Sequence, residues 1–243
     1  MADGDDQQSL SQSIKGRLQE GVQNSVFRDK GLLDPDAVID EDRIVGRDDQ
    51  LDDIITYLRP ALQGNRPPNM LLYGPSGTGK SLIINAVCQQ VLELANAQDD
   101  RFGVIKINCQ TIKSHDRAVY RLVENAANEA GVEIGVPQSG VSTDQKLNRF
   151  YEVLSNNFDS VIIILDEIDL LVGRQRDPNE EPAYSKLLYQ LSRASQLGQI
   201  EGHVSVAALT NDPRFMENLD GRAESSFNPQ DVVFSDYDAD QLQ

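Results

Sequence analysis

A glycine-rich turn at residues 74–81 has the residue types best suited to chemistry. It reads Gly-Pro-Ser-Gly-Thr-Gly-Lys-Ser and follows a short apolar run that begins at Met70. Its three glycines allow backbone conformations that a Cβ disfavours, so that successive N–H groups can point toward one phosphate. The lysine can reach the β- and γ-phosphates, and the serine hydroxyl can ligate Mg²⁺. The candidate nucleotide-binding residues are Gly74, Pro75, Ser76, Gly77, Thr78, Gly79, Lys80 and Ser81, and Ser81 is also a candidate metal ligand.

The segments on either side of this turn fit the same chemistry. The apolar run before it has the character of a strand, and residues 80 to about 95 predict a helix with an apolar face made of Leu82, Ile83, Ala86, Val87, Val91 and Leu94. The positive N-terminal end of that helix would face the same phosphate. This order of strand, turn and helix indicates nucleotide binding. The alternative is a glycine-rich turn that matches the pattern by accident.

Two carboxylates follow a second apolar run. Five large aliphatic residues at 161–165 predict a strand that is covered on both faces, as in a parallel sheet, and Asp166 and Glu167 come directly after them. The carboxyl ends of such strands face the ligand crevice. Asp166 is predicted to hold Mg²⁺ through water, and Glu167 to orient and polarise the attacking water. The alternative is a buried strand that ends in a solvated acidic turn.

A polar residue follows a third predicted strand at residues 203–209. Asn211 stands two residues after that strand. Its amide can hydrogen-bond both the γ-phosphate and the lytic water, so it is predicted to act as a polar sensor of the nucleotide. Taken alone, this residue is equally typical of a turn. Its position after the two earlier motifs favours the sensor.

The composition points to an unusual solvent. The chain has 243 residues, with 39 acidic and 22 basic side chains and a formal net charge of −17. Such a charge is unlike that of a typical nucleic-acid binder. However, the acidic residues are dispersed, and arginines outnumber lysines by 15 to 7. A dispersed acidic surface with few lysines is typical of a protein that works in very high salt, because counter-ions screen the self-repulsion. The alternative is an acidic protein from ordinary salt.

Several classes of protein are excluded by residue usage. Cys88 and Cys109 lack C-x-x-C spacing, which indicates buried thiols in a reduced, cytoplasmic chain rather than a redox centre. The two histidines, His115 and His203, have no zinc-site spacing, and a Ser-His-Asp hydrolase is not indicated. No apolar run approaches the ~20 residues of a membrane span, and the polar start is no signal peptide. We therefore expect no membrane partner.

The chain divides into an arm, a core and a short end. Residues 1–33 are expected to form an N-terminal arm, disordered at first and then helical, that docks on the core or, alternatively, binds a partner. Residues 34–235 are expected to form the core. Its further predicted elements are a helix that follows Leu51 and runs through Leu62, strands at 104–108 and 232–234, and helices at 116–130, at 182–197 and from the predicted cap Thr143 to Leu154.

The ordered set of motifs resembles an AAA+ ATPase, and within that class it is similar to the archaeal replication initiators, the relatives of the origin recognition complex and of the cell-division-cycle loader. The segments that indicate the broad class are residues 44–47, 74–81, 161–167, 210–211 and 219–227. The segments that indicate the narrower family are Val26-Phe27-Arg28-Asp29 with Leu32-Leu33, Pro67-Pro68-Asn69 and the insertion around Pro137. The resemblance implies an α/β fold, a three-layer P-loop NTPase (AAA+) core with a parallel sheet flanked by helices, and the cofactors ATP and Mg²⁺.

The resemblance also assigns roles to residues outside the two motifs. The backbone at Val45 is expected to lie against the adenine, and Arg222 corresponds to the arginine finger that reaches the nucleotide of a neighbouring subunit. The insertion corresponds to a motif that wedges into the DNA minor groove. The implied DNA contacts are Val136, Pro137, Gln138, Ser139, Gly140 and Val141. Locally, Lys146 and Arg149 offset Asp144, so this patch is expected to escape the negative charge of the chain. The alternative is an ordinary surface loop.

The expected function is that of an ATP-binding and ATP-hydrolysing replication initiator. Its expected partners are origin double-stranded DNA, other initiator subunits and the replicative helicase that it helps to load. Family members continue into a helical lid and a winged-helix domain, so residues 236–243 are expected to begin a truncated lid. The alternatives are a different AAA+ machine, such as a clamp loader or remodelling ATPase, and a catalytically idle nucleotide-binding interaction module.

Overall fold

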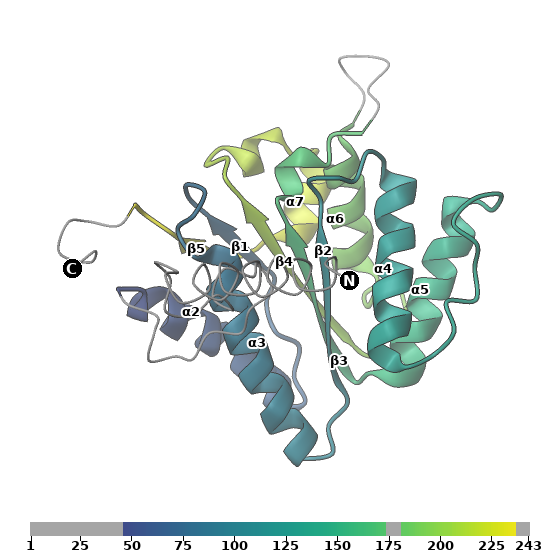
Figure 1. The fold of residues 1–243 in the computed structure, drawn as a ribbon, viewed down its shortest axis with the longest axis horizontal. Coiled ribbons are helices and arrows are strands. Elements are labelled where there is room, and N and C mark those ends of the chain that lie inside the picture. Colours follow the sequence, from purple (N-terminus) through teal and green to yellow (C-terminus); the bar gives the residue numbers. More distant parts are fainter. Residues whose placement is uncertain (1–45, 174–180, 237–243) are drawn as a thin grey trace, which may run out of the picture. The chain divides into compact units, whose positions relative to one another are not determined.

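A parallel sheet forms the centre of the protein in the computed structural model, which describes residues 46–173 and 181–236. The five strands lie in the order β2-β3-β4-β1-β5, and every neighbouring pair is parallel. Their bounds are β1 (Met70–Tyr73), β2 (Phe102–Asn108), β3 (Ser160–Asp166), β4 (His203–Thr210) and β5 (Gln230–Val233). Because all five run the same way, their carboxyl ends share one edge of the sheet (Figure 1).

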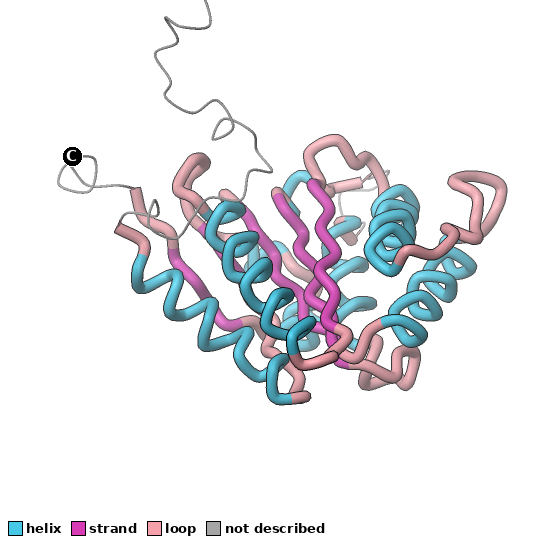
Figure 2. The backbone as a smooth tube through the Cα atoms, turned by 60° about the horizontal axis from the view of Figure 1, so that its bottom comes forward, coloured by secondary structure: helices cyan, strands magenta, loops and turns pink. Residues whose placement is uncertain are grey.

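Helices cover both faces of the sheet, as Figure 2 shows. They are α2 (Asp48–Leu58), α3 (Lys80–Ala97), α4 (His115–Ala130), α5 (Thr143–Asn157), α6 (Ala183–Arg193) and α7 (Gly221–Phe227). Successive strand residues point to opposite faces. In β3, Ile162 and Ile164 pack with α2 and α3, whereas Ile163 and Leu165 pack with α4, α5, α6 and α7. The predicted three-layer α/β fold is therefore confirmed.

Strand β3 is buried along its whole length. Its five aliphatic residues are at most 2% exposed, because β2 and β4 flank the strand and helices cover it on both sides. The prediction of a doubly covered strand at 161–165 is confirmed. Burial continues to the last residue, since Asp166 is only 8% exposed. The strand thus delivers a carboxylate to the edge of the sheet with little solvent around it.

The Pro-Pro-Asn sequence at residues 67–69 has a structural role. It comes before the glycine-rich turn at residues 74–81, which we call the phosphate loop. Asn69 is 7% exposed, and its side chain accepts a hydrogen bond from Val206 N at 3.0 Å and donates one to Phe227 O at 2.6 Å. Its own carbonyl accepts from Gln230 N at 2.8 Å. One buried amide therefore holds the start of β1 between β4 and β5, where burial makes an unpaired polar group costly.

Several element ends differ from the predictions. Ser142, not Thr143, caps α5, because Ser142 is extended and its hydroxyl accepts from Gln145 N in a capping box. The helix expected to continue through Leu62 becomes a 3₁₀ turn at Arg59–Gln63, where Pro60 lacks an N–H. The helix expected at 182–197 ends at Arg193, and the last strand is Gln230–Val233 rather than 232–234.

Some expectations fall outside the described residues. They are the arm at 1–33, the adenine contact at Val45, and residues 237–243 at the end of the chain. Within the two described ranges, every helix is too short or too polar to cross a lipid bilayer.

Candidate nucleotide-binding site

The glycine-rich turn joins β1 to the first turn of α3. Gly74, Gly77 and Gly79 have φ values of 149°, 80° and 94°, which L-residues rarely adopt. The hydroxyl of Thr78 closes the turn by donating to Pro75 O at 2.8 Å. The three glycines therefore adopt the kind of backbone conformation, disfavoured by a Cβ, that the sequence predicts for this turn.

Gly74 meets a second requirement that the sequence does not reveal. A Cβ at this position would stand 1.9 Å from Phe234 O, inside the backbone that follows β5. Phe234 N donates to Tyr73 O at 2.8 Å, so the two segments are held at this distance. Glycine is thus needed both for the turn and for the close approach of β5.

Lys80 lies at the centre of the site. Its residue exposure is 7%, and its Nζ donates to Gly74 O at 2.7 Å, to Pro75 O at 2.8 Å and to Asn211 Oδ1 at 2.9 Å. Burial lowers the pKa of Lys80, whereas the nearby carboxylates Asp166, Asp169 and Glu167 act to raise it. The lysine of the loop, both predicted carboxylates and the predicted sensor amide therefore meet at the carboxyl edge of the sheet.

Glu167 has an unusual backbone. It follows the last residue of β3 and has φ 51° and ψ 44°, in the left-handed region that few non-glycine residues enter. Such a conformation costs on the order of 1–3 kcal/mol and is concentrated at functional sites. It turns the chain sharply after Asp166 and leaves the Glu167 side chain partly exposed. The two adjacent carboxylates thus have different surroundings, with the first buried and the second accessible to solvent.

Sequence reasoning missed a third carboxylate, Asp169. Thr210 is 1% exposed, and its hydroxyl donates to Asp169 Oδ1 at 2.7 Å and accepts from Asp212 N at 3.0 Å. This bridge ties the turn after β3 to the end of β4, next to Asn211. The available signal was the spacing Asp-Glu-x-Asp at residues 166–169. Its significance depends on Thr210, which is 41 residues away in the sequence.

The oxygen donors fit a magnesium ion. Ser81 provides a hydroxyl in the first turn of α3, and Asp166 provides a carboxylate at the end of β3. Mg²⁺ is usually held by one or two protein ligands, with phosphates and water completing its shell. Among the residues that the structure describes, no three His, Cys, Asp or Glu side chains gather to form a metal site by themselves. The donor set thus suits a cation that arrives with a nucleotide.

Arg222 lies apart from this constellation. It is in α7 with its side chain 69% exposed, and it pairs with Asp220 at 3.0 Å and with Glu181 at 3.4 Å. Its guanidinium also lies 5.7 Å from the ring centroid of Tyr189. None of these partners belongs to the phosphate loop or to the ends of β3 and β4. The structure therefore does not bring Arg222 to the site of its own chain.

The predicted DNA-contacting loop connects α4 to α5 and runs alongside α5 (Figure 1). Pro137, Gln138, Ser139 and Gly140 are exposed, Val141 is half-buried, and Val136 packs partly against the core. The expectation that Lys146 and Arg149 offset Asp144 at this surface is wrong, because both cations are paired with other carboxylates. Lys146 is 1% exposed and paired with Asp116, and Arg149 is paired with Glu152 at 3.1 Å. Both cations turn inward because the loop and the adjacent helices offer them oxygen partners.

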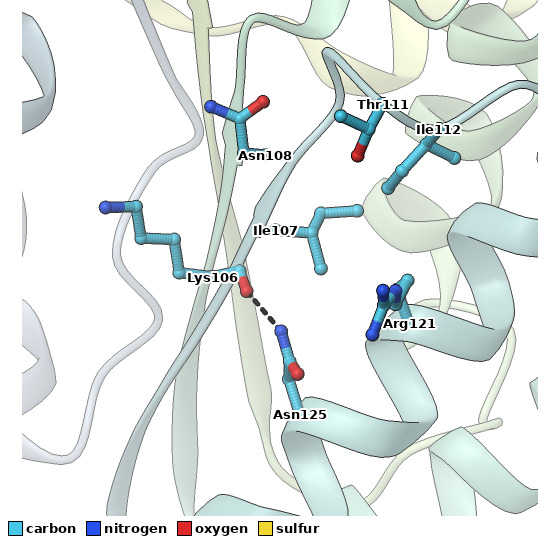
Figure 3. Close-up of a pocket in the computed structure, with 7 residues that line it drawn as sticks. All are labelled: Lys106, Ile107, Asn108, Thr111, Ile112, Arg121 and Asn125. Carbon is cyan, nitrogen blue, oxygen red and sulfur yellow. Dashed lines mark hydrogen bonds between the residues drawn. The ribbon is translucent and has the colours of Figure 1, made fainter. Parts of the chain in front are cut away.

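A separate hollow of about 180 Å³ lies beside the edge strand β2. Figure 3 shows that the Lys106 side chain points away from it, while its carbonyl accepts a hydrogen bond from Asn125. Arg121 lines the hollow but is paired with Glu124. Its lining residues include none of the predicted site residues, so we assign no function to it.

The two cysteines are buried and unpaired, as predicted. Burial raises the pKa of Cys88 to about 12, and it does the same for Cys109, with a smaller effect from Asp166. Thiols with such pKa values are poor nucleophiles at neutral pH. Neither cysteine contributes chemistry to the site.

Comparisons with known proteins agree with this geometry. Residues 70–230 match the ATPase family associated with various cellular activities (AAA). ORC1-type DNA replication protein 5 of Halobacterium salinarum is 64% identical over 218 residues, which cover 90% of this chain and 50% of that protein. ORC1-type DNA replication protein 2 of the same organism is 37% identical over 89% of this chain and 78% of its own length.

A solved structure gives the same result. The Aeropyrum pernix ORC1 protein, solved in complex with DNA, superposes with a TM-score of 0.73 at 32% identity, covering 88% of this chain and 51% of that one. The chain thus spans about half the length of this protein and of the first relative. The interpretation of a salt-adapted chain agrees with relatives from a halophilic archaeon. The chain belongs to the AAA ATPase family and, within it, to the ORC1-type DNA replication proteins.

Proposed function

We propose that this chain binds ATP with Mg²⁺ and hydrolyses ATP slowly, as part of a replication initiator that recognises origin DNA. The observation that carries the proposal is the position of Lys80 Nζ, between the carbonyls of the phosphate loop and Asn211, where the charges of Asp166, Asp169 and Glu167 act on it. A buried ammonium with this surrounding suits a triphosphate, whose oxygens can take over its hydrogen bonds.

Each group at the edge of the sheet has a proposed task. The amides of residues 74–80 hold the phosphates, and Lys80 orients the β- and γ-phosphates. Ser81 and Asp166 hold the cation, whose chemistry is to neutralise charge on the phosphate oxygens. Glu167 polarises the attacking water, and Asn211 orients that water and the γ-phosphate. Asp169 acts indirectly, because it holds Thr210 beside the sensor residue.

The adenine is proposed to lie against the backbone at Val45. The adjoining residues support this placement, because they are fixed to the end of β5 beside the phosphate loop. Arg47 is 2% exposed and donates to Ser235 O at 2.7 Å, and Gln50 donates to Val233 O at 2.9 Å. The start of α2 is therefore tied close to the loop that would hold the phosphates.

Two exposed parts of the chain are proposed to bind partners. Residues 136–141 are proposed to contact duplex DNA, because a backbone-rich loop with an apolar residue and small polar groups suits a widened minor groove. The likeness to the ORC1 protein that was solved with DNA supports this role. Arg222 is proposed to reach the nucleotide of a neighbouring initiator subunit, since it is exposed and distant from its own site. Helicase loading is the proposed outcome of this assembly.

The test is ATP binding and turnover at molar KCl for the wild-type chain and for Glu167→Gln. We expect Glu167→Gln to bind ATP normally and to lose turnover by about 100-fold or more, as for loss of a general base. Glu217→Gln, an exposed glutamate in the 3₁₀ turn Phe215–Asn218, is the matched control and should turn over normally. Normal turnover in Glu167→Gln would remove Glu167 from its role.

Two further experiments distinguish the proposed function from the two alternative functions. A wild-type chain that binds ATP without turnover, alone and with a full-length relative, would be an idle nucleotide-binding module. Footprinting on origin-like duplex at molar salt distinguishes an initiator from a clamp loader or remodelling ATPase, because only an initiator should show a preferred site.

A further inference from the structure

Two cations of α5 hold the loop at residues 131–142 through its carbonyl groups. Arg149 Nε donates to Ile134 O at 3.0 Å, and its terminal nitrogen donates to Glu133 O at 2.6 Å. Lys146 Nζ donates to Gln138 O at 2.8 Å. The loop is therefore fixed at its beginning by Arg149 and near its middle by Lys146.

Lys146 has no donor left for a ligand. Its side chain is 1% exposed, and besides Gln138 O its ammonium binds both carboxylate oxygens of Asp116 at 2.7 and 2.8 Å. An ammonium has three donors, and these three acceptors use them all. Thr143 also donates to Asp116 at 2.8 Å, which fixes the carboxylate. A buried charge is stable only when it is paired in this way, so the position of Lys146 determines that of Gln138.

The chain approaches Arg149 closely at Gly135. This residue has φ 72°, and a Cβ here would stand 2.8 Å from Arg149 Nε. The loop thus needs a glycine where it wraps around the guanidinium. Val136 and Ile134 pack partly against the core on either side of this contact. Side-chain packing and hydrogen bonds therefore specify the same path for the loop.

The exposed tip of the loop carries no charge. Residues 136–141 read Val-Pro-Gln-Ser-Gly-Val, and Glu133 is the one ionisable residue between 131 and 142. Gly140 has φ 86° and open space around it. A tip of this kind can offer backbone amides and small polar groups, but it does not neutralise phosphates and so releases no counter-ions.

We propose that Lys146 and Arg149 are positioning residues that hold the 131–142 loop in one shape before DNA arrives, so that the loop adds DNA affinity that does not fall with salt. The inference rests on the proposed DNA-binding role of this loop. A loop that is already ordered loses less conformational entropy on binding. In molar salt, where phosphate contacts are weakened, such a contribution matters most.

The first experiment needs no DNA. Thermolysin cleavage between residues 131 and 142 is measured at molar KCl for wild type, Lys146→Met and Arg149→Met. We expect cleavage to be about 10-fold faster in both variants, because Lys146→Met loses one charged hydrogen bond to the loop and Arg149→Met loses two. Arg121→Met is the matched control, since Arg121 and Arg149 each pair with a glutamate three residues later but only Arg149 contacts the loop. Unchanged cleavage in both loop variants would overturn the inference.

The second experiment measures the affinity for duplex DNA over a series of KCl concentrations. We expect Lys146→Met and Arg149→Met to bind about 10-fold more weakly, with ATP affinity and the slope of log Kd against log [KCl] unchanged. A residue that contacts a phosphate would instead change that slope by about 0.9. A slope change of this size, or an affinity equal to that of Arg121→Met, would overturn the inference.

The two experiments separate this inference from the proposed function. If the wild-type chain has no DNA affinity, the proposed DNA-binding role fails, and the cleavage result still decides whether the two cations order the loop. If a Gln138→Ala, Ser139→Ala double variant binds DNA weakly while Lys146→Met and Arg149→Met bind normally, the DNA-binding role stands and the positioning role is wrong.

Discussion

The ammonium nitrogen of Lys80 lies 2.9 Å from Oδ1 of Asn211, although 131 residues separate them in the sequence. The register of the sheet explains this contact. Strands β1 and β4 are parallel neighbours, and Tyr73 is opposite Thr210, so the segments that follow these two residues start from the same level. A γ-phosphate that binds Lys80 must therefore replace, or be shared with, the amide of Asn211. If Asn211 is the sensor that we propose, this contact lets it distinguish a triphosphate from a diphosphate.

Replacing Lys80 should remove nucleotide affinity. Lys80→Ala deletes a buried ammonium with three hydrogen bonds, so we expect ATP affinity to fall by on the order of 100-fold or more. Fluorescent-nucleotide titration at molar KCl measures this. Lys113→Ala removes an exposed lysine and the same charge, and it should bind ATP normally. Equal affinity in the two variants would contradict the assignment of the phosphate loop.

The bridge between Asp169 and Thr210 should affect turnover more than binding. Thr210→Val keeps the shape of this buried side chain but removes the 2.7 Å bond to Asp169 and the acceptor for Asp212 N. Because these bonds fix the segment that carries Asn211, we expect kcat to fall by roughly 10-fold with little change in ATP affinity. Steady-state ATPase kinetics and nucleotide titration measure the two quantities. A change in affinity alone would show that the bridge does not position the sensor.

The motifs of the site and their convergence at one end of the sheet were predictable from the sequence, but several of the contacts that hold them were not. The phosphate loop and β3 can each be predicted from a segment of fewer than about twelve residues, because glycine spacing and a run of aliphatic residues are local patterns. The partner of Asp169 is 41 residues away, and the partner of Lys146 is 30 residues away. Sequence reasoning counted Lys146 as surface charge because lysine is rarely buried, and no local pattern shows that Asp116 will pair with it.

The fold shows the same division. The order and type of the elements followed from apolar periodicity, whereas the cap of α5 depended on which of two adjacent hydroxyl residues is extended. Ser142 takes the cap because the hydroxyl of Thr143 is bound to Asp116 of α4. A contact between α4 and α5 thus determines the first residue of α5, which residue propensity alone did not predict.

Adding a methyl group at Gly74 should destabilise the fold. The new Cβ would meet the Phe234 carbonyl oxygen at 1.9 Å in a backbone that cannot easily move, so we expect Gly74→Ala to lower the free energy of unfolding by about 2–4 kcal/mol. Gly64→Ala is the control, since Gly64 also has a positive φ but nothing lies within 4 Å of its added Cβ. It should cost only about 1–2 kcal/mol from backbone strain. Urea unfolding at fixed KCl measures both, and equal losses would argue against the contact with Phe234.

Arg222 should act on a neighbouring subunit. We expect Arg222→Ala to bind ATP normally, because Arg222 contacts no group of its own site, but to lose turnover in the assembled state. Mixing it equally with Glu167→Gln provides the decisive measurement. If the finger acts between subunits, one half of the sites keep Glu167 and one half of their neighbours keep Arg222, so roughly a quarter of wild-type turnover should return. No recovery on mixing would indicate that Arg222 does not act across an interface.

Stability should depend on pH through His115, which lies in the first turn of α4. Its Nε2 is 2.7 Å from Gln190 Oε1. Burial lowers the pKa of His115 below its ordinary 6.5. The hydrogen bond with Gln190 raises it in part, Lys186 lowers it further, and Asp116 and Asp144 raise it by less. Below pH 6.5 the unfolded chain therefore binds a proton that the folded chain resists. The contribution of neutral His115 to the free energy of unfolding is therefore fully present above pH 6.5, and it is lost as the pH falls through the pKa of His115 in the folded chain.

Replacing His115 should remove this dependence. We expect the urea midpoint of the wild-type chain to fall between pH 7.5 and 5.5 at constant KCl, and His115→Gln to show a smaller fall because glutamine does not titrate. His203→Gln is the matched control, since His203 is the other histidine of the chain and begins β4 at a distance from the contact between His115 and Gln190. The urea midpoint of His203→Gln should fall with pH almost as much as that of the wild-type chain. If His203→Gln flattened the profile and His115→Gln did not, the acid sensitivity would have to be assigned to the start of β4 rather than to the contact between α4 and α6.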